Sequence, residues 1–286
     1  MDGVNMSNTN AASKRGISGF DLKLIAIISM FIDHFAAVVI WGFINASYKV
    51  GGSYEIQASS GIMEHILLWV SNNRESMWAG YDVMRLVGRI AFPIYCFLIV
   101  EGFAHTKNVK KYALRLGIFA LISEIPFDLA FNESWLATYS NNVFFTLVIG
   151  LLVIWGISYV EKFHVVWKEK NLDPFLGAVF TLGAAVMLIA AGVYIAEFML
   201  FTDYGAAGVI TIVVMYLLRR APLLGFSLAV LALTAMTNSN EIVALLGLVP
   251  LFRYTGARGK KVKYFFYVFY PAHLLFFWLI TVVLGL

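Results

Sequence analysis

Apolar residues are gathered along the chain in long runs that short polar stretches separate, which is the pattern of helices that cross a membrane. The first run covers residues 20–44, and later runs cover residues 85–103, 112–131, 143–160, 175–198, 206–218, 222–236, 242–252 and 264–284. We therefore predict an all-α polytopic membrane protein with about nine transmembrane helices. The sixth, seventh and eighth runs are short for a bilayer, so the expected range is eight to ten.

Two segments outside these runs have other patterns. Residues 1–19 are rich in Ser and Asn and lack an apolar period, which predicts a disordered cytoplasmic tail before a single transmembrane helical domain at 20–286. The apolar piece at 62–70 is too short to span a bilayer. It predicts one interfacial helix on the outer side.

Composition narrows the function classes. Hydrophobic residues make up 60% of the chain and charged residues only 13%, which excludes an ordinary soluble domain. The single cysteine, Cys96, can form neither an intramolecular disulfide nor a cysteine-based zinc site. We expect a lipid bilayer around the protein, no metal and no nucleic-acid partner.

Basic residues alternate between the loops and so predict the orientation. They gather before the first run and after the second, fourth, sixth and eighth runs: Lys14, Arg15, Lys23, Lys107, Lys110, Lys111, Lys162, Lys168, Lys170, Arg219, Arg220, Arg253, Arg258, Lys260, Lys261 and Lys263. Loops rich in Lys and Arg stay in the cytoplasm. The N-terminus is therefore predicted to be cytoplasmic and the C-terminus exoplasmic.

Two histidines are expected near the bilayer midplane. His34 lies eleven residues beyond Lys23 on the same face of a helix, which places it about 16 Å above the cytoplasmic boundary. His273 lies ten residues beyond Lys263 on a helix of the same direction. An ionisable group at this depth is costly, so we predict that the two histidines share a site. The alternative is that each is an ordinary core residue bonded to a neighbouring helix.

Other polar residues near these histidines are less distinctive. Asp33 precedes His34 but points about 100° away on a helix, so a carboxylate from another helix is the expected partner of that imidazole. His65 and His164 fall in predicted loops. His105 lies one turn from Glu101 and is expected to form an interfacial pair with it.

A second polar group is predicted at the outer ends of two antiparallel helices. Arg85 and Arg89 are four residues apart on one helix, and Glu124 and Asp128 are four apart on the next, at matching depth. Pro93 and Pro126 lie nearby. Two interpretations stay open. The charges form a structural ion-pair network, or they line an outer half-pocket that binds a polar acceptor.

Five stretches of the chain resemble the TraX family, over nearly the whole length from residue 20 onward. They are Phe20-Asp21-Leu22-Lys23 to Asp33-His34, Arg85-Leu86-Val87-Gly88-Arg89-Ile90-Ala91-Phe92-Pro93, Lys110-Lys111-Tyr112-Ala113-Leu114-Arg115 to Ser123-Glu124-Ile125-Pro126-Phe127-Asp128, Asn142-Val143-Phe144-Phe145-Thr146, and Lys263-Tyr264-Phe265-Phe266-Tyr267 to Tyr270-Pro271-Ala272-His273. Lys23, ten residues and His34 are also similar to the Arg, ten residues, His pattern of integral-membrane sugar O-acyltransferases, with Lys in place of Arg.

The namesake of the TraX family is associated with N-terminal acetylation of conjugative pilin. The resemblance therefore implies an acyltransferase of the bacterial inner membrane, with acyl-CoA, most simply acetyl-CoA, as donor. The donor phosphates would bind Lys23, Lys110, Lys111 and Arg115. His34 would act as general base, and His273 would orient the reacting groups. An amine or hydroxyl acceptor, such as a pilin N-terminus or a surface glycan, would arrive from the exoplasmic side and bind near Arg85, Arg89, Glu124 and Asp128.

Two other classes of function fit parts of the pattern. Midplane histidines and intramembrane carboxylates also occur in proton-coupled secondary transporters, although these favour inverted repeats with interrupted helices, and no such repeat is evident. A non-catalytic scaffold of a conjugation or secretion system is the third class. It gives no reason for a polar stripe along the first helix.

Overall fold

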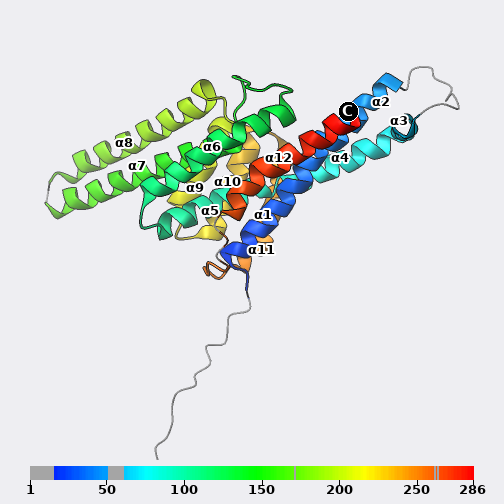
Figure 1. The fold of residues 1–286 in the computed structure, drawn as a ribbon. Coiled ribbons are helices and arrows are strands. Elements are labelled where there is room, and N and C mark those ends of the chain that lie inside the picture. The colour runs from blue at the N-terminus through cyan, green and yellow to red at the C-terminus, as the bar shows by residue number, and fades with distance from the viewer. Residues whose placement is uncertain (1–15, 51–60, 171, 261, 263) are drawn as a thin grey trace, which may run out of the picture.

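The chain is helical throughout the part that the computed structural model describes, which is residues 16–50, 61–170, 172–260, 262 and 264–286 (Figure 1). Within these residues, strand-like pairing is limited to isolated bridges between Ile17 and Tyr254 and between Asn141 and Thr202. The predicted all-helical class is confirmed. Most of the predicted tail, residues 1–15, lies outside the described residues, as do Lys261 and Lys263.

The helices follow in the order α1 (Gly19–His34), the π-helical turn η1 (Phe35–Ile40), α2 (Trp41–Val50), α3 (Ile62–Asn72), α4 (Arg74–Gly88), α5 (Ala91–His105), α6 (Val109–Phe131), α7 (Val143–Glu169), α8 (Pro174–Tyr194), η2 (Ile195–Met199), α9 (Gly205–Leu217), α10 (Pro222–Met236), the 3₁₀ segment η3 (Ser239–Gly247), α11 (Leu248–Phe252) and α12 (Phe265–Leu284).

Residues 16–19 lie against a basic loop. The N–H of Ile17 donates to the carbonyl of Arg253 at 2.9 Å, and the N–H of Gly19 donates to that of Ala257 at 2.8 Å. Ser18 then caps α1, because its hydroxyl accepts from the Asp21 N–H and its own N–H donates to the Asp21 carboxylate. The start of α1 is thereby fixed to the loop before α12.

Helix α1 continues through η1 into α2 as one apolar stretch, Gly19–Lys49. The wider π-helical turn begins directly after His34. Such turns insert an extra residue into a helix and are frequent at functional sites.

The second predicted helix begins earlier than expected and is broken. Helix α4 ends at Gly88 and α5 begins at Ala91. Tight turns close the break, since the N–H groups of Arg89 and Ile90 donate to carbonyls three residues back. Pro93 falls in the first turn of α5, where a missing N–H is tolerated. The helix predicted at 62–70 is present as α3, and its position at an interface stays a prediction.

Within the described part of the chain, five helical stretches are long and apolar enough to cross a membrane: Gly19–Lys49, Arg74–His105, Val143–Glu169, Pro174–Met199 and Phe265–Leu284. Helix α6 has 23 residues but carries Arg115, Glu124 and Asp128, and three further apolar helices are shorter. These features agree with a polytopic membrane protein. The nine crossings and their orientation stay predictions.

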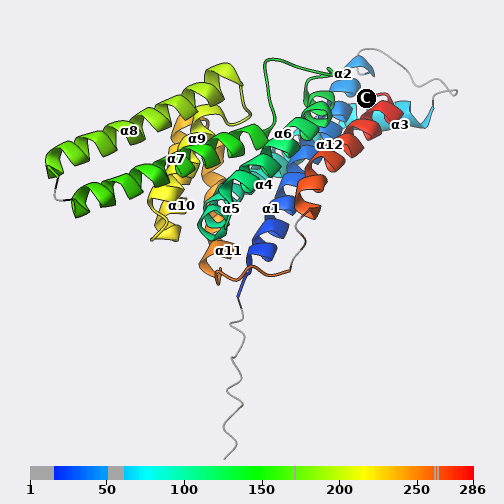
Figure 2. The same cartoon turned by 60° about the vertical axis from the view of Figure 1, so that its left-hand side comes forward.

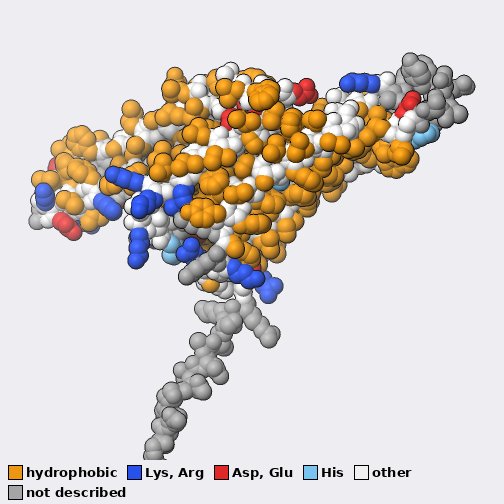
Figure 3. All heavy atoms as spheres, viewed as in Figure 1, with side chains coloured by type: hydrophobic (Ala, Val, Ile, Leu, Met, Phe, Trp, Pro, Cys, Tyr) orange, Lys and Arg blue, Asp and Glu red, His pale blue; other side chains and the backbone are white. Residues whose placement is uncertain are grey.

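Helices α1 and α12 lie side by side in both views (Figures 1 and 2). Helix α12 also packs against α6 and η1, while α1 packs against α4 and α5. The flank of the molecule is largely apolar, and Lys and Arg side chains gather near the start of α1, along the lower edge of Figure 3. A surface of this kind suits contact with lipid between two polar edges.

Reporter fusions test the predicted orientation. Fusions after Arg220 and Arg258 are expected to be cytoplasmic, and fusions after Asn132 and Ser239 exoplasmic, because the Lys and Arg residues alternate between the loops. Paired alkaline phosphatase and fluorescent protein fusions at each position measure the side. One fusion on the wrong side removes the argument that places both histidines at one depth.

Candidate functional site

His34 and His273 meet in the structure. His34 Nδ1 lies 2.7 Å from His273 Nε2, within hydrogen-bond distance, and the two ring planes are within 3° of parallel. His34 is the last residue of α1, and His273 lies within α12. The contact follows from the packing of α12 against α1 and η1. The partner of His34 on another helix is therefore an imidazole and not the carboxylate that we expected.

A backbone carbonyl fixes the protons of the neutral histidine pair. His273 Nδ1 lies 2.7 Å from the carbonyl oxygen of Phe269, and a carbonyl only accepts, so this nitrogen carries the proton. His273 Nε2 must then accept, and His34 Nδ1 must donate to it. The unshared electron pair of His34 is left on Nε2. This nitrogen is the one that can take a proton.

Aromatic rings surround the histidine pair. The His34 ring has its centroid 5.4 Å from that of Phe131 and 6.0 Å from that of Tyr270. The His273 ring lies 5.7 Å from Phe277, and its side chain is buried. This packing excludes bulk water and fixes both imidazoles.

Asp33 lies beside the free nitrogen of His34. Its Oδ2 is 4.0 Å from His34 Nε2, which is too long for a hydrogen bond, and 2.5 Å from Arg85 Nη1. Gly88 makes this position possible, because a Cβ there would overlap the Asp33 carboxyl group. Asp33 thus pairs with Arg85 of α4. Helical geometry predicted that the Asp33 carboxylate would point away from His34, but it lies beside that imidazole.

Of the two interpretations left open, the ion-pair network between Arg85, Arg89 and the acids of α6 is not formed. Arg89 Nη1 instead pairs with Glu241 Oε1 of η3 at 2.8 Å. Glu241 is 1% exposed, and its Oε2 has no hydrogen-bond partner among the described residues. The break between α4 and α5 turns Arg89 away from α6 and toward η3. The prediction rested on equal distance along the two helices and did not include the direction in which each side chain points around its helix.

The two acids of α6 bind neighbouring polar groups and not the two arginines. Glu124 accepts from the Asn142 side chain at the start of α7, and its Oε1 is unpartnered among the described residues. Asp128 accepts from the Ala137 N–H at 2.7 Å and from Asn132 at 2.8 Å, which ties down the loop after α6. Asp128 is fully buried.

Asp203, in the loop before α9, belongs to the same group of charges. The residue is exposed, but the protein atoms around it partly desolvate its carboxyl group, and this desolvation raises its pKa to about 6. The negative charge of Asp33 adds to the increase in pKa. Arg89 and Arg85 oppose the increase in pKa. We call Asp33, Arg85, Arg89, Asp203 and Glu241 the charge cluster. It holds three carboxyl groups and two guanidinium groups.

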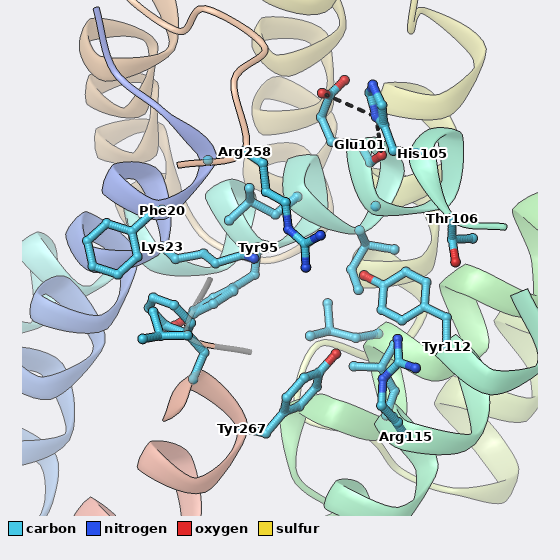
Figure 4. A pocket seen from close by; sticks show the side chains of 18 of the residues that line it. Phe20, Lys23, Tyr95, Glu101, His105, Thr106, Tyr112, Arg115, Arg258 and Tyr267 are labelled. Atoms are coloured by element: carbon cyan, nitrogen blue, oxygen red, sulfur yellow. Dashed lines mark hydrogen bonds and ion pairs between the residues drawn. The ribbon is translucent and has the colours of Figure 1, made fainter. Parts of the chain in front are cut away.

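A cavity of about 500 Å³ opens among the basic loops and reaches toward the histidine pair. Lys23 of α1, Arg115 of α6 and Arg258 of the loop before α12 extend into it from three sides (Figure 4). Its deeper wall includes Met30 and Tyr270. We call this space the basic cavity.

The basic cavity contains only part of the predicted donor site. Lys23 and Arg115 line it, whereas Lys110 and Lys111 are exposed on the first turn of α6 and lie outside. In the sequence, Arg258 contributed only to the predicted orientation of the chain in the membrane. Other polar residues line the wall as well, among them Glu101, Lys107, Tyr112, Tyr254, Lys260 and Tyr267, and their positions in the sequence do not predict that they meet.

His65 and His164 lie away from the site, whereas His105 lines the basic cavity (Figure 4). His65 falls in α3, the helix predicted at 62–70 in the outer loop. His164 lies in α7 and not in the loop predicted for it, and its Nδ1 is 3.1 Å from the Thr181 hydroxyl. His105 lies 4.0 Å from the Glu101 carboxylate, as expected. In the described residues, no group of three or more His, Cys, Asp or Glu side chains is placed to hold a metal ion.

Comparisons with known proteins identify the family. The family model described as TraX protein matches residues 18–281, which include α1, both histidines and every residue of the charge cluster. The probable fimbrial assembly protein FimC, serogroup H1, of Dichelobacter nodosus is 27% identical to the chain over 285 residues, covering 90% of this chain and 93% of that protein. No solved structure matches the chain significantly. The match over the histidine pair and nearly the whole helical domain shows that the chain belongs to the TraX family.

Proposed function

We propose that the protein is a membrane-embedded acyltransferase. It moves an acyl group, most simply acetyl, from cytoplasmic acyl-CoA to an amine or hydroxyl acceptor presented from the exoplasmic side of the bacterial inner membrane. One observation carries the proposal. A basic cavity leads to a buried histidine pair whose free nitrogen faces a separate charge cluster. Donor and acceptor can therefore approach the same imidazole from opposite sides.

The basic cavity suits a long, polyanionic donor. Lys23, Arg115 and Arg258 line it, and none of them pairs with a described carboxylate within 4.0 Å, so their charges are available to phosphates. The Nε of Arg115 has no partner among the described residues. Deeper walls are apolar and aromatic, and a cavity of about 500 Å³ falls in the size range of cofactor sites. The pantetheine arm would occupy this deeper part.

His34 Nε2 is the base in the proposed reaction. It takes a proton from the acceptor while the acceptor atom attacks the thioester carbonyl carbon. The tetrahedral intermediate then collapses, the carbon–sulfur bond breaks, and the thiolate takes the proton from His34. The acyl group ends on the acceptor and the donor leaves as free CoA. His273 acts through His34, because its Nε2 accepts the Nδ1 proton and holds the ring.

The charge cluster favours an amine over an alcohol as acceptor. With all groups ionised, the cluster holds three carboxylates and two guanidinium groups, which leaves one negative charge in excess in a cluster whose Asp33 adjoins His34. An ammonium ion would balance this charge on binding, and a neutral hydroxyl would not. The bound ammonium would pass one proton to a carboxylate of the cluster before its nitrogen attacks, and His34 takes the second proton during the attack. The fimbrial assembly name of the relative supports a protein at the cell surface, such as a pilin N-terminus, as the source of that amine.

Radiolabelled acetyl-CoA tests the function. Purified protein in detergent is incubated with [¹⁴C]acetyl-CoA and matched acceptors, namely a pilin N-terminal peptide, the same peptide with a blocked α-amine, and an amino sugar. We expect label on the free-amine peptide and little on the blocked one. Release of CoA without labelled acceptor, or an absence of any acetyl-CoA binding, contradicts acyl transfer. A proton-coupled transporter or a scaffold is then the better reading.

Lys23→Ala tests the donor site. Lys23 is expected to contact a donor phosphate, so the variant should raise the KM for acetyl-CoA about tenfold and leave kcat within a few-fold. Lys23→Arg should be mild because the charge stays. Lys110→Ala is the matched control, since this exposed lysine lies outside the basic cavity. Equal donor affinity in wild type and Lys23→Ala would remove the proposed phosphate contact.

A further inference from the structure

Tyr270 stands between the basic cavity and the histidine pair. It lines the cavity, whereas neither His34 nor His273 does. Its ring lies 6.0 Å from the His34 ring and 5.7 Å from the His273 ring, and the residue is 3% exposed. An acyl group at the deep end of the cavity would therefore touch Tyr270 before any other polar side chain of the site.

The Tyr270 hydroxyl has an unused proton. The backbone of Val143, the first residue of α7, lies close to this hydroxyl and also lines the cavity. A phenol that accepts one hydrogen bond can still donate another. No acceptor for that proton lies within hydrogen-bond distance among the described residues, and the carboxylates of Asp203 and Glu124 act on the hydroxyl only through their charges. Because Tyr270 lines the cavity, a ligand there can supply the acceptor.

Packing alone does not explain a tyrosine at this position. The Tyr270 ring packs edge-on against Phe144, with centroids 5.0 Å apart, and against both imidazoles, and a phenylalanine would make the same ring contacts. A hydroxyl buried in an apolar setting lowers stability unless its bonds are made. The hydroxyl therefore points to a partner that arrives with a ligand.

We propose that the Tyr270 hydroxyl binds the carbonyl oxygen of the donor thioester and stabilises the oxyanion formed during transfer. The inference rests on the proposed function. As the acceptor attacks the carbonyl carbon, the π electrons of the C=O bond move to oxygen, and the Tyr270 O–H strengthens its hydrogen bond to that negative charge. When the carbon–sulfur bond breaks, the electrons return to C=O. Tyr270 keeps its own proton throughout.

Tyr270→Phe tests this role because it removes only the hydroxyl. Loss of one oxyanion donor lowers kcat by about 10²- to 10³-fold, so we expect a decrease of this size with the Kd for acetyl-CoA within about threefold of wild type. Infrared difference spectra of bound [1-¹³C]acetyl-CoA give a second measurement. The carbonyl stretch should lie at lower frequency in wild type than in Tyr270→Phe, because the hydrogen bond weakens the C=O bond.

Tyr194→Phe is the matched control, since Tyr194 is exposed on α8 and loses the same hydroxyl far from the cavity. It should transfer at the wild-type rate. A kcat within threefold of wild type in Tyr270→Phe overturns the inference, as does a carbonyl stretch that is identical in the two complexes. Both results leave acyl transfer by the wild type intact. A wild-type protein that neither binds acetyl-CoA nor transfers acetyl overturns the proposed function, and the role of Tyr270 with it.

Discussion

His34→Ala should insert, fold and still bind acetyl-CoA, yet lose acyl transfer by about 10²- to 10⁴-fold, which is on the order of 3 to 5 kcal/mol in the barrier. The reason is the assignment of protons in the histidine pair. His34 Nε2 carries the available electron pair, whereas both nitrogens of His273 are engaged. The measurement is kcat with saturating acetyl-CoA, alongside size-exclusion chromatography and donor affinity.

His273→Ala should lose less activity, because it removes the group that orients the base and leaves the base itself. His164→Ala is the matched control. It removes an imidazole from α7, away from the basic cavity, and should stay within a few-fold of wild type. If well-folded His34→Ala transfers within a few-fold of wild type, His34 is a packing residue and the proposed mechanism is wrong.

Hydropathy predicted the ends of several helices closely. The runs at 222–236 and 264–284 match α10 (Pro222–Met236) and α12 (Phe265–Leu284). It missed the first part of α4, where the helix starts at Arg74 although the apolar run starts at 85. Glu75, Gly80 and Asp82 lower the average there. A helix that extends beyond an apolar run can keep its backbone hydrogen bonds while its side chains are polar, so hydropathy does not mark its end.

The meeting of the two histidines was the part of the site that the sequence could predict. His34 follows Lys23 by eleven residues and His273 follows Lys263 by ten, so counting residues predicted that the two would come together, and in the structure they do. Direction around a helix was not predictable in the same way. Arg89 sits at a break between α4 and α5, and its partner Glu241 lies in a 3₁₀ segment far along the chain. The predicted match in depth between Arg89 and Glu124 therefore did not produce a contact between them.

The role of Tyr270 lay outside what a sequence pattern shows. The residue stands three positions before His273 in a helix that is rich in aromatic side chains, where a tyrosine is ordinary. Only the three-dimensional arrangement shows that it lines the basic cavity on one side and contacts the His34 ring on the other. Contacts among α1, α6, α7 and α12 create this position, and each depends on the packing of helices distant in sequence.

Arg89→Leu should lower the free energy of unfolding by about 3 to 5 kcal/mol, because it leaves the Glu241 carboxylate buried without its partner. Glu241 is 1% exposed and Arg89 only 20%, so solvent cannot replace the lost interaction. Thermal unfolding in detergent measures the loss. Arg219→Leu is the matched control. Its partner Glu161 is 39% exposed, and exposed pairs contribute at most about 1 kcal/mol.

Replacing both partners, as Arg89→Leu with Glu241→Met, should restore most of the lost stability, since apolar side chains of similar size can replace a buried ion pair. The double variant still contains Asp33, Arg85 and Asp203, so one negative charge in excess stays beside His34. Acyl transfer should therefore remain within a few-fold of wild type. A double variant that unfolds like the single one would show that the pair supports more than its own charges. One that folds normally but no longer transfers would assign Arg89 and Glu241 to the acceptor, because the loss would then come from binding and not from stability.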